Sequence, residues 1–158
     1  MKSLLVSFVC ILVTTFTAYA QPADESIGIG VSTGWHQGAN ITYVINQDMH
    51  FSFQLGVHIN NGEGHPTIAP QLRYFLAHKG NFHPYAVGSV YFSEGGMKGQ
   101  AYDADMGILA GVGASYFPTK DINVYGQISV ADIALQSSNT GSSFGILMPS
   151  VGIEWFIW

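Results

Sequence analysis

The chain has 158 residues, of which 47% are hydrophobic, only 9% are charged and 19 are glycine, and its formal net charge at pH 7 is −5. Because a soluble domain typically carries about 25% charged residues, this composition excludes an ordinary water-exposed surface. The acidic balance, with no basic stripe, also excludes nucleic acid as a partner.

The first 20 residues have the three parts of a secretory signal peptide. Lys2 supplies a positive charge, Leu4–Val13 form an apolar stretch, and Ala18-Tyr19-Ala20 is a small-x-small cleavage site. The apolar stretch is shorter than the roughly 20 residues that a membrane-spanning helix needs. We therefore expect a cleaved signal over 1–20 and one domain over 21–158. Cys10 leaves with the signal, so no disulfide is expected.

Downstream of the signal, apolar and polar residues alternate along eight segments. In Phe51–Asn60, for example, Phe, Phe, Leu, Val and Ile alternate with Ser, Gln, Gly, His and Asn. This period of two predicts strands, and a closed sheet is the way for strands to cross a bilayer with every backbone group paired. The predicted strands are Ile27–Trp35, Asn40–Ile45, Phe51–Asn60, Pro70–Leu76, Pro84–Phe92, Gly107–Tyr116, Ile122–Val130 and Phe144–Trp158.

Only the fifth predicted strand has an ambiguous facing. Its alternation is weak, and Pro84 and Gly88 indicate a bulge or a strong bend there.

The connections fall into two sets. An even strand number places both termini on one side, which is the periplasm in bacterial barrels. We expect periplasmic turns at Asn46–His50, Ala77–Phe82 and Pro118–Asp121. We expect extracellular loops at Trp35–Ala39, which is short, and at the longer Asn60–Thr67, Ser93–Asp105 and Gln136–Ser143. Interfacial girdles are expected from aromatic residues near strand ends, namely Trp35, Tyr74, Phe92, Tyr116 and Trp155.

The last strand shows the alternation most clearly. The outward positions are Val151, Ile153, Trp155 and Ile157, and the inward positions are Ser150, Gly152 and Glu154. One face therefore suits lipid and the other suits a polar interior.

Together with this strand, Gln71–Phe75, His83–Gly88 and Gly111–Phe117 resemble the small outer-membrane β-barrel superfamily, the OmpA/OmpX-like eight-stranded proteins. The resemblance implies an all-β, antiparallel, up-and-down transmembrane barrel in the bacterial outer membrane. It also implies a terminal assembly signal read by the barrel-assembly machinery, made of Ser150, Gly152, Trp155 and Ile157. Trp158 lies one residue beyond the expected end of that signal.

An eight-stranded barrel is just wide enough for side chains to fill it, so a diffusion pore is disfavoured. The expected lumen residues are Gln54, His58, Gln71, Arg73, Tyr125, Gln127 and Glu154. Arg73 and Glu154 are the two charges that the pattern places inside, and buried charges need partners. We therefore expect an ion pair between them.

Two groups of residues in the loops and strand ends resemble chemical sites. Gln136-Ser137-Ser138-Asn139-Thr140-Gly141 is similar to the active segment of lipid A deacylases, but glutamine stands in the place of the histidine base. Topology places three histidines toward the extracellular end and three toward the periplasmic end, namely His36, His58 and His65, then His50, His78 and His83. No pair has ligand spacing within one strand face. No catalytic residue, metal site or cofactor is therefore predicted.

The sequence predicts a monomeric, non-enzymatic outer-membrane barrel with a structural role or a role in binding a surface partner through its loops. Outer-membrane lipid and the barrel-assembly machinery are the other expected partners. Two alternatives stay open: a lipid A-modifying enzyme of the deacylase kind or an inactive relative, and a secreted soluble lipocalin-like barrel that binds a small ligand.

Overall fold

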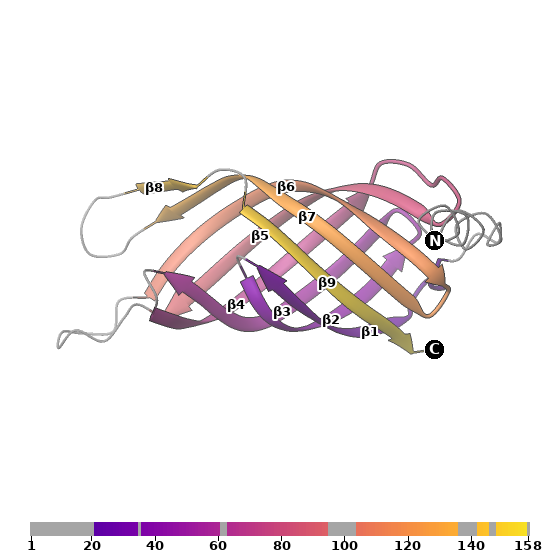
Figure 1. Ribbon diagram of the computed structural model, residues 1–158, viewed down its shortest axis with the longest axis horizontal. Coiled ribbons are helices and arrows are strands. Elements are labelled where there is room, and N and C mark those ends of the chain that lie inside the picture. The colour runs from indigo at the N-terminus through magenta and orange to yellow at the C-terminus, as the bar shows by residue number, and fades with distance from the viewer. Residues whose placement is uncertain are drawn as a thin grey trace, which may run out of the picture.

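The computed structural model describes residues 21–34, 36–60, 63–94, 104–135, 142–145 and 148–157. These residues form one antiparallel sheet whose strands follow one another around a barrel (Figure 1). The strands are β1 (Ile27–Gly34), β2 (His36–Asn46), β3 (Met49–Asn60), β4 (Glu63–Phe75), β5 (Phe82–Glu94), β6 (Ala104–Thr119), β7 (Ile122–Leu135), β8 (Ser142–Gly145) and β9 (Met148–Ile157). Among the described residues, no helix is long and apolar enough to cross a membrane.

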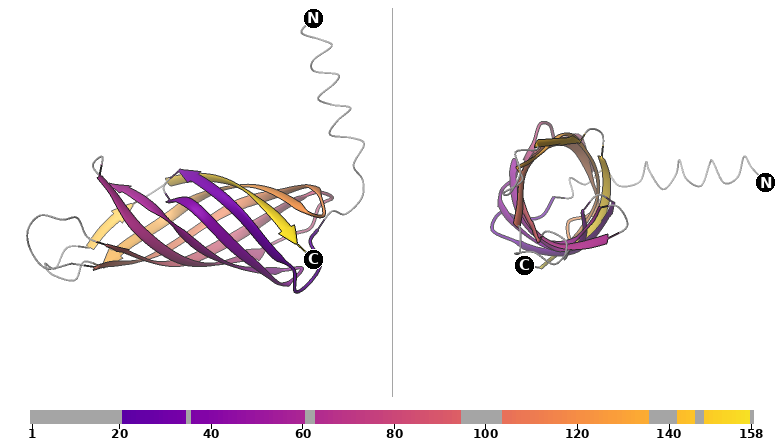
Figure 2. Two further views of the ribbon diagram at one scale, coloured as in Figure 1. Left: turned by 90° about the horizontal axis from the view of Figure 1, so that it is seen from below. Right: turned by 90° about the vertical axis from the view of Figure 1, so that its left-hand side faces the viewer.

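The sheet closes on itself through its last strand. β9 pairs with β1, with Trp155 opposite Ile29, and it also pairs with β7, with Trp155 opposite Ile122. β8 pairs with the other end of β7, so β8 and β9 occupy one position in the barrel wall. The end-on view in Figure 2 shows the closed ring. The prediction of an eight-stranded antiparallel barrel is thus confirmed.

The two ends of the barrel differ in their connections. Ile27 and Ile157 are register partners, so both termini of the barrel wall lie at one end. We call this end, where residues 47–48, 76–81 and 120–121 join the strands, the turn end. The opposite end, where β1 joins β2, β3 joins β4 and β5 joins β6, is called the loop end.

Apolar side chains cover the outside of the wall. In β9, Val151 and Trp155 are 55% and 64% exposed, whereas Glu154 is 1% exposed. The same alternation holds along the other strands, and for all of them except β5 the sequence predicts which face points outward. A closed sheet with a continuous apolar exterior pairs its backbone internally and presents a surface suited to hydrocarbon. Outward aromatic rings near the turn end belong to Tyr43, Phe51, Tyr74, Phe82, Tyr116 and Trp155. Trp35 lies outside the described residues.

The predicted bulge in β5 is wrong. β5 pairs with β6 without a register shift, with Pro84 opposite Ala114 and Gly88 opposite Ala110. His83, Tyr85 and Val87 are buried, whereas Gly88 is exposed. The facing was ambiguous because Tyr85, Val87 and Tyr91 on the lumen side of β5 are no more polar than the residues on its outer side. The register shifts lie elsewhere, at Val44/Asn46 between β2 and β3 and at Ala110/Gly111 and Tyr116/Thr119 between β6 and β7.

The hairpins at the loop end are longer than predicted. The expected loops at Trp35–Ala39 and Asn60–Thr67 are largely strand, because β2 starts at His36, β3 runs to Asn60 and β4 starts at Glu63. Backbone hydrogen bonding continues through these polar and glycine-rich residues, since the ladder does not require alternating side chains. Residues 95–103 and 136–141, which make up most of the expected loops Ser93–Asp105 and Gln136–Ser143, lie outside the described residues.

Candidate functional site in the barrel lumen

The carboxylate of Glu154 is the centre of the hydrogen-bond network inside the barrel. It lies on the inward face of β9 and accepts four hydrogen bonds. Asn40 Nδ2 and Thr42 Oγ1 donate to Oε1 at 2.6 and 2.8 Å. Asn123 Nδ2 and Arg73 Nη1 donate to Oε2 at 2.7 and 2.9 Å. A carboxylate buried in this way keeps its hydrogen-bonding capacity filled and its charge paired, as burial of a charge requires.

A glycine on β1 lets donors from β2 reach this carboxylate. Gly30 lies between its register partners Glu154 on β9 and Asn40 on β2. A Cβ atom at Gly30 would lie 2.5 Å from Asn40 Oδ1 and 2.8 Å from Glu154 Cγ. The bond between Asn40 and Glu154 therefore crosses an intervening strand that has no side chain at this point.

Arg73 is held on its other sides by aromatic rings and an amide. Its Nε donates to Gln71 Oε1 at 3.3 Å. Its guanidinium carbon lies 4.1 Å from the centroid of the Tyr125 ring and 5.7 Å from that of Tyr85, which are cation–π distances. Only 1% of the Arg73 side chain is exposed. The guanidinium is thus enclosed between one carboxylate and two rings.

Inward glycines make room for these rings. Tyr125 and Tyr85 each lie over the glycine opposite in the neighbouring strand, Gly152 and Gly113 respectively, where a Cβ atom would collide with the ring. The pairing of an inward aromatic ring with a cross-strand glycine lets large side chains lie flat inside a narrow barrel.

An apolar layer closes the lumen between the Arg73–Glu154 pair and the turn end. Val44, Phe117 and Phe156 pack together there. The His50 ring contacts the same layer, with its centroid 4.6 Å from Phe75 and 6.0 Å from Phe156. Neither nitrogen of His50 has a hydrogen-bond partner within the described residues. His50 is therefore packed here as an aromatic ring, out of reach of solvent.

Between the ion pair and the loop end, polar side chains fill the lumen. Ser52 Oγ donates to Thr42 Oγ1 at 2.8 Å, since the single Thr42 proton is already given to Glu154. Tyr85 donates to Gln127 Oε1 at 3.2 Å, and Gln54 donates to Ser32 Oγ at 2.6 Å.

The lumen is closed to water at the level of the ion pair. A water-filled channel through the barrel would leave the side chains that line it exposed. Instead, Arg73 and Glu154 are each 1% exposed, and Phe117 and His50 are 0% exposed. The arrangement is a packed plug rather than a cleft with an open reacting group.

The structure places most of the predicted lumen residues where the alternation put them. Gln71, Arg73, Tyr125 and Glu154 are buried, while Gln54 and Gln127 are half-buried. The side chain of His58 is outside the described part. Sequence reasoning missed Asn40, Thr42 and Asn123 as partners of Glu154. The alternation pattern places all three on the lumen side, but no local signal indicates that residues of β2 and β7 meet at one carboxylate of β9.

The members of the expected assembly signal take alternating positions on β9. Ser150 and Gly152 are on the lumen side, whereas Trp155 and Ile157 are 64% and 54% exposed on the outer surface. Recognition of these residues by the barrel-assembly machinery stays a prediction.

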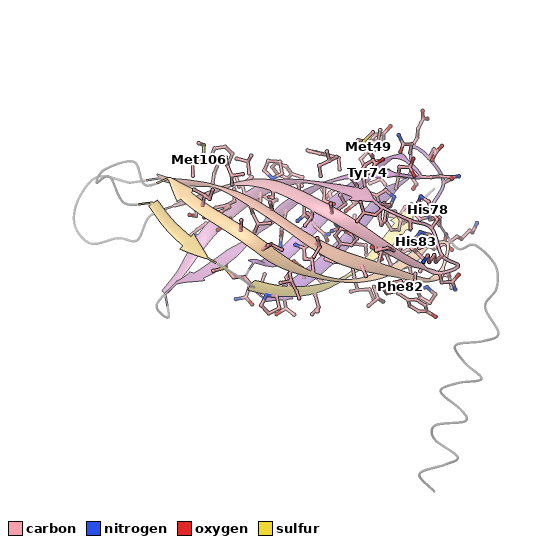
Figure 3. All side chains as sticks on the ribbon, turned by 90° about the horizontal axis from the view of Figure 1, so that it is seen from above. Met49, Tyr74, His78, Phe82, His83 and Met106 are labelled. Carbon is pink, nitrogen blue, oxygen red and sulfur yellow. The ribbon has the colours of Figure 1, made fainter. Side chains whose placement is uncertain are left out.

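A second polar cluster lies at the turn end (Figure 3). His78 Nδ1 lies 2.8 Å from His83 Nδ1, and His78 Nε2 lies 2.8 Å from Asp48 Oδ1. His83 Nε2 donates to the Gly80 carbonyl at 2.9 Å. Among the side chains that the structure describes, no group of three or more His, Cys, Asp or Glu residues is arranged to hold a metal ion. The deacylase-like segment from Gln136 to Gly141 lies outside the described residues.

Replacing Gly30 with alanine should destabilise the barrel by about 1–3 kcal/mol, because the new methyl group overpacks the contact between Asn40 and Glu154. Urea unfolding in lipid vesicles would measure this loss. Gly88→Ala is the matched control, since a Cβ atom at Gly88 meets nothing within 4 Å. Equal stability of the two variants would show that the space above Gly30 is not used by the network.

Comparison with known proteins identifies a solved structure with a similar fold. No protein-family model matches the chain, and no curated protein matches it. Among solved structures, the chain is similar to the crystal structure of the N-terminal β-barrel domain of Pseudomonas aeruginosa OprF, with 14% sequence identity and a TM-score of 0.61. The match covers 85% of this chain and 98% of that chain. At this identity the likeness shows the fold alone, a small closed antiparallel β-barrel like that of the OprF domain.

Proposed function

We propose that this chain is a non-enzymatic integral protein of the bacterial outer membrane. In this proposal its barrel is a sealed membrane anchor, and the connections Ser93–Asp105 and Gln136–Ser143 bind a partner at the cell surface. The observation that carries the proposal is the plugged lumen, in which Arg73 and Glu154 are bonded to each other and to neighbouring side chains.

The buried ion pair supports a structural role for the lumen. Each oxygen of Glu154 already accepts two hydrogen bonds, and the side chain is 0% exposed. A general acid, general base or nucleophile must touch its substrate, and no substrate can reach this carboxylate. The charges therefore serve to fix the relative positions of β4, β7, β9 and β2.

The outer surface and the fold support the membrane location. A contiguous apolar exterior of this size marks a membrane or protein interaction site, and a barrel has no free strand edge within the bilayer. The likeness to an outer-membrane barrel domain points to the same location.

The strand topology supports surface presentation. The two long connections join β5 to β6 and β7 to β8, so both leave the barrel at the loop end, opposite the termini. With the termini in the periplasm, this end faces the outside of the cell.

Planar-bilayer recordings of the purified mature protein test the sealed lumen. We expect no stepwise conductance above that of the bare bilayer, because the apolar layer and the ion pair block the axis. Stable single-channel steps would contradict the proposal and favour a pore. A variant with Phe117, Phe156 and Arg73 all replaced by alanine is the positive control, because it removes large side chains from the plug.

Mass spectra of lipid A separate the proposal from a lipid-modifying enzyme. We expect identical lipid A from cells with and without the protein. A change in acylation that disappears when the Gln136–Ser143 connection is replaced by a glycine-serine linker would overturn the non-enzymatic assignment. Recovery of the mature protein in the aqueous phase without detergent would overturn the membrane assignment and favour a soluble ligand-binding barrel.

A further inference from the structure

His50 is a titratable side chain that takes no part in the hydrogen-bond network of the lumen. It is the second residue of β3, and it is 0% exposed. Neither of its ring nitrogens has a hydrogen-bond partner within the described residues. Because buried polar groups in proteins are almost always hydrogen-bonded, an unpaired imidazole in a packed interior requires an explanation.

Aromatic rings enclose His50 in the apolar layer near the turn end. Its ring meets those of Phe75, Phe117 and Phe156 edge to face, with centroids 4.6, 6.5 and 6.0 Å away. A phenylalanine at this position could make the same kind of contact without burying an unpaired N–H group. The property that histidine adds is a change of charge between about pH 5 and pH 8.

The surroundings of His50 offer no partner for a positive charge. Among the described residues, the charged and titratable groups that act on it are Arg73 on β4, Glu154 on β9, His83 on β5 and His78 in the connection between β4 and β5. Arg73 is its cross-strand partner and is itself a cation. Glu154 is already paired with Arg73 and bonded to three neutral donors. A protonated His50 would therefore be an unpaired cation in an apolar layer, which is strongly unfavourable.

His83 contacts the same layer but differs in its hydrogen bonding. Its ring centroid lies 5.2 Å from that of Phe117. Its Nε2 donates to the Gly80 carbonyl, and its Nδ1 lies 2.8 Å from His78 Nδ1. A proton added to this pair of imidazoles can be shared between the two Nδ1 atoms, whereas a proton added to His50 has no acceptor.

We propose that His50 is an acid sensor, and that the apolar layer stays closed only while this ring is neutral. On protonation the ring moves out of the layer toward water at the turn end, which is close because residues 47–48 immediately precede β3. The layer is therefore closed above the pH range in which histidine titrates and opens as the pH falls through and below that range. This inference rests on the sealed lumen proposed above and states how the seal responds to pH.

Thiol labelling at Val44 tests whether acid opens the layer. Val44 is 0% exposed and is the cross-strand partner of His50 on β2. Residues 21–158 contain no cysteine, so Val44→Cys supplies a single thiol. Dithiodipyridine is a suitable reagent because it also reacts with thiols at acidic pH. For the mature chain in detergent micelles, we expect slow labelling at about pH 7.5 and labelling at least about tenfold faster at about pH 4.5, because protonation becomes tenfold more favourable with each pH unit.

Replacing His50 in the Val44→Cys background identifies the sensor. His50→Phe should abolish the acceleration by acid, and His50→Leu is a second neutral replacement for the case that phenylalanine does not fit. Heat-dependent gel migration verifies that each variant stays folded at both pH values. Urea unfolding in lipid vesicles should show that the chain with His50 loses more stability between the two pH values than the chain with His50→Phe.

His83→Phe is the matched control, because it removes a histidine beside the same layer and keeps His50. We expect it to retain the acceleration by acid. Equal labelling rates at the two pH values, acceleration that persists in His50→Phe and His50→Leu, or acceleration that is lost in His83→Phe would each overturn the inference and leave the sealed lumen intact. Fast labelling of Val44→Cys already at about pH 7.5 would contradict the sealed lumen itself and the inference with it.

Discussion

Replacing Arg73 with methionine should lower the free energy of unfolding by about 3–5 kcal/mol. Removal of one member of a buried ion pair leaves the other charge without compensation in a low-dielectric interior. Methionine keeps most of the volume of the arginine stem, so the loss reports on charge rather than on a cavity. Glu154 would retain only the three neutral donors Asn40, Thr42 and Asn123.

Urea unfolding in lipid vesicles, followed by tryptophan fluorescence, measures this loss. The double variant Arg73→Met/Glu154→Gln provides the internal control, because it removes both charges and keeps an amide oxygen for the donors from β2. We expect the double variant to be less destabilised than Arg73→Met alone, which is the signature of direct coupling in a double-mutant cycle. If Arg73→Met lowered the free energy of unfolding by less than about 1 kcal/mol, the buried charge of Glu154 would not depend on Arg73 for its compensation.

Val112→Arg should destabilise the barrel by about 2–4 kcal/mol in lipid vesicles. Val112 lies near the middle of β6 and is 51% exposed on the outer surface. An arginine near the bilayer midplane of a transmembrane barrel carries a cost of this size, whereas the cost falls to about 0–1 kcal/mol near the interface.

Thr119→Arg is the matched control on the same strand. Thr119 is exposed at the turn-end terminus of β6, beyond the outward ring of Tyr116. Equal and small effects of the two variants would mean that the exterior faces water, where surface substitutions usually change stability by no more than about 0.5 kcal/mol. The comparison therefore separates a membrane barrel from a soluble one on a single strand.

The sequence was informative wherever the two faces of a strand differ in chemistry. Alternation placed Ile153 and Trp155 outward and Glu154 inward, and the structure has the same facing. In β5, Tyr85 and Val87 point inward beside outward Ala86 and Gly88, so the two faces are too similar for the pattern to distinguish. The sequence also underestimated the length of the strands at the loop end, because β3 and β4 stay paired through His58 and His65, beyond the segment of alternating apolar residues.

The ion pair between Arg73 and Glu154 was expected from the sequence and is present in the structure, but the other partners of Glu154 were beyond sequence reasoning. Arg73 and Glu154 are 81 residues apart and lie on strands that are not neighbours in the barrel wall. The alternation pattern placed Arg73 and Glu154 on the lumen face, but it placed Asn40 and Asn123 there as well. Which of these side chains meet depends on the stagger between strands and on the absence of a side chain at Gly30.

The sequence by itself determined the class of structure, because the alternation of apolar and polar residues is a local pattern. It indicates only which face of each strand is suited to an apolar exterior and which to a polar lumen. Tertiary structure alone decided which residues share a level of the barrel, since strand tilt and stagger are set when β9 closes against β1. That closure brings four donors from β2, β4 and β7 to Glu154. This arrangement cannot be predicted from the spacing of residues along any one strand.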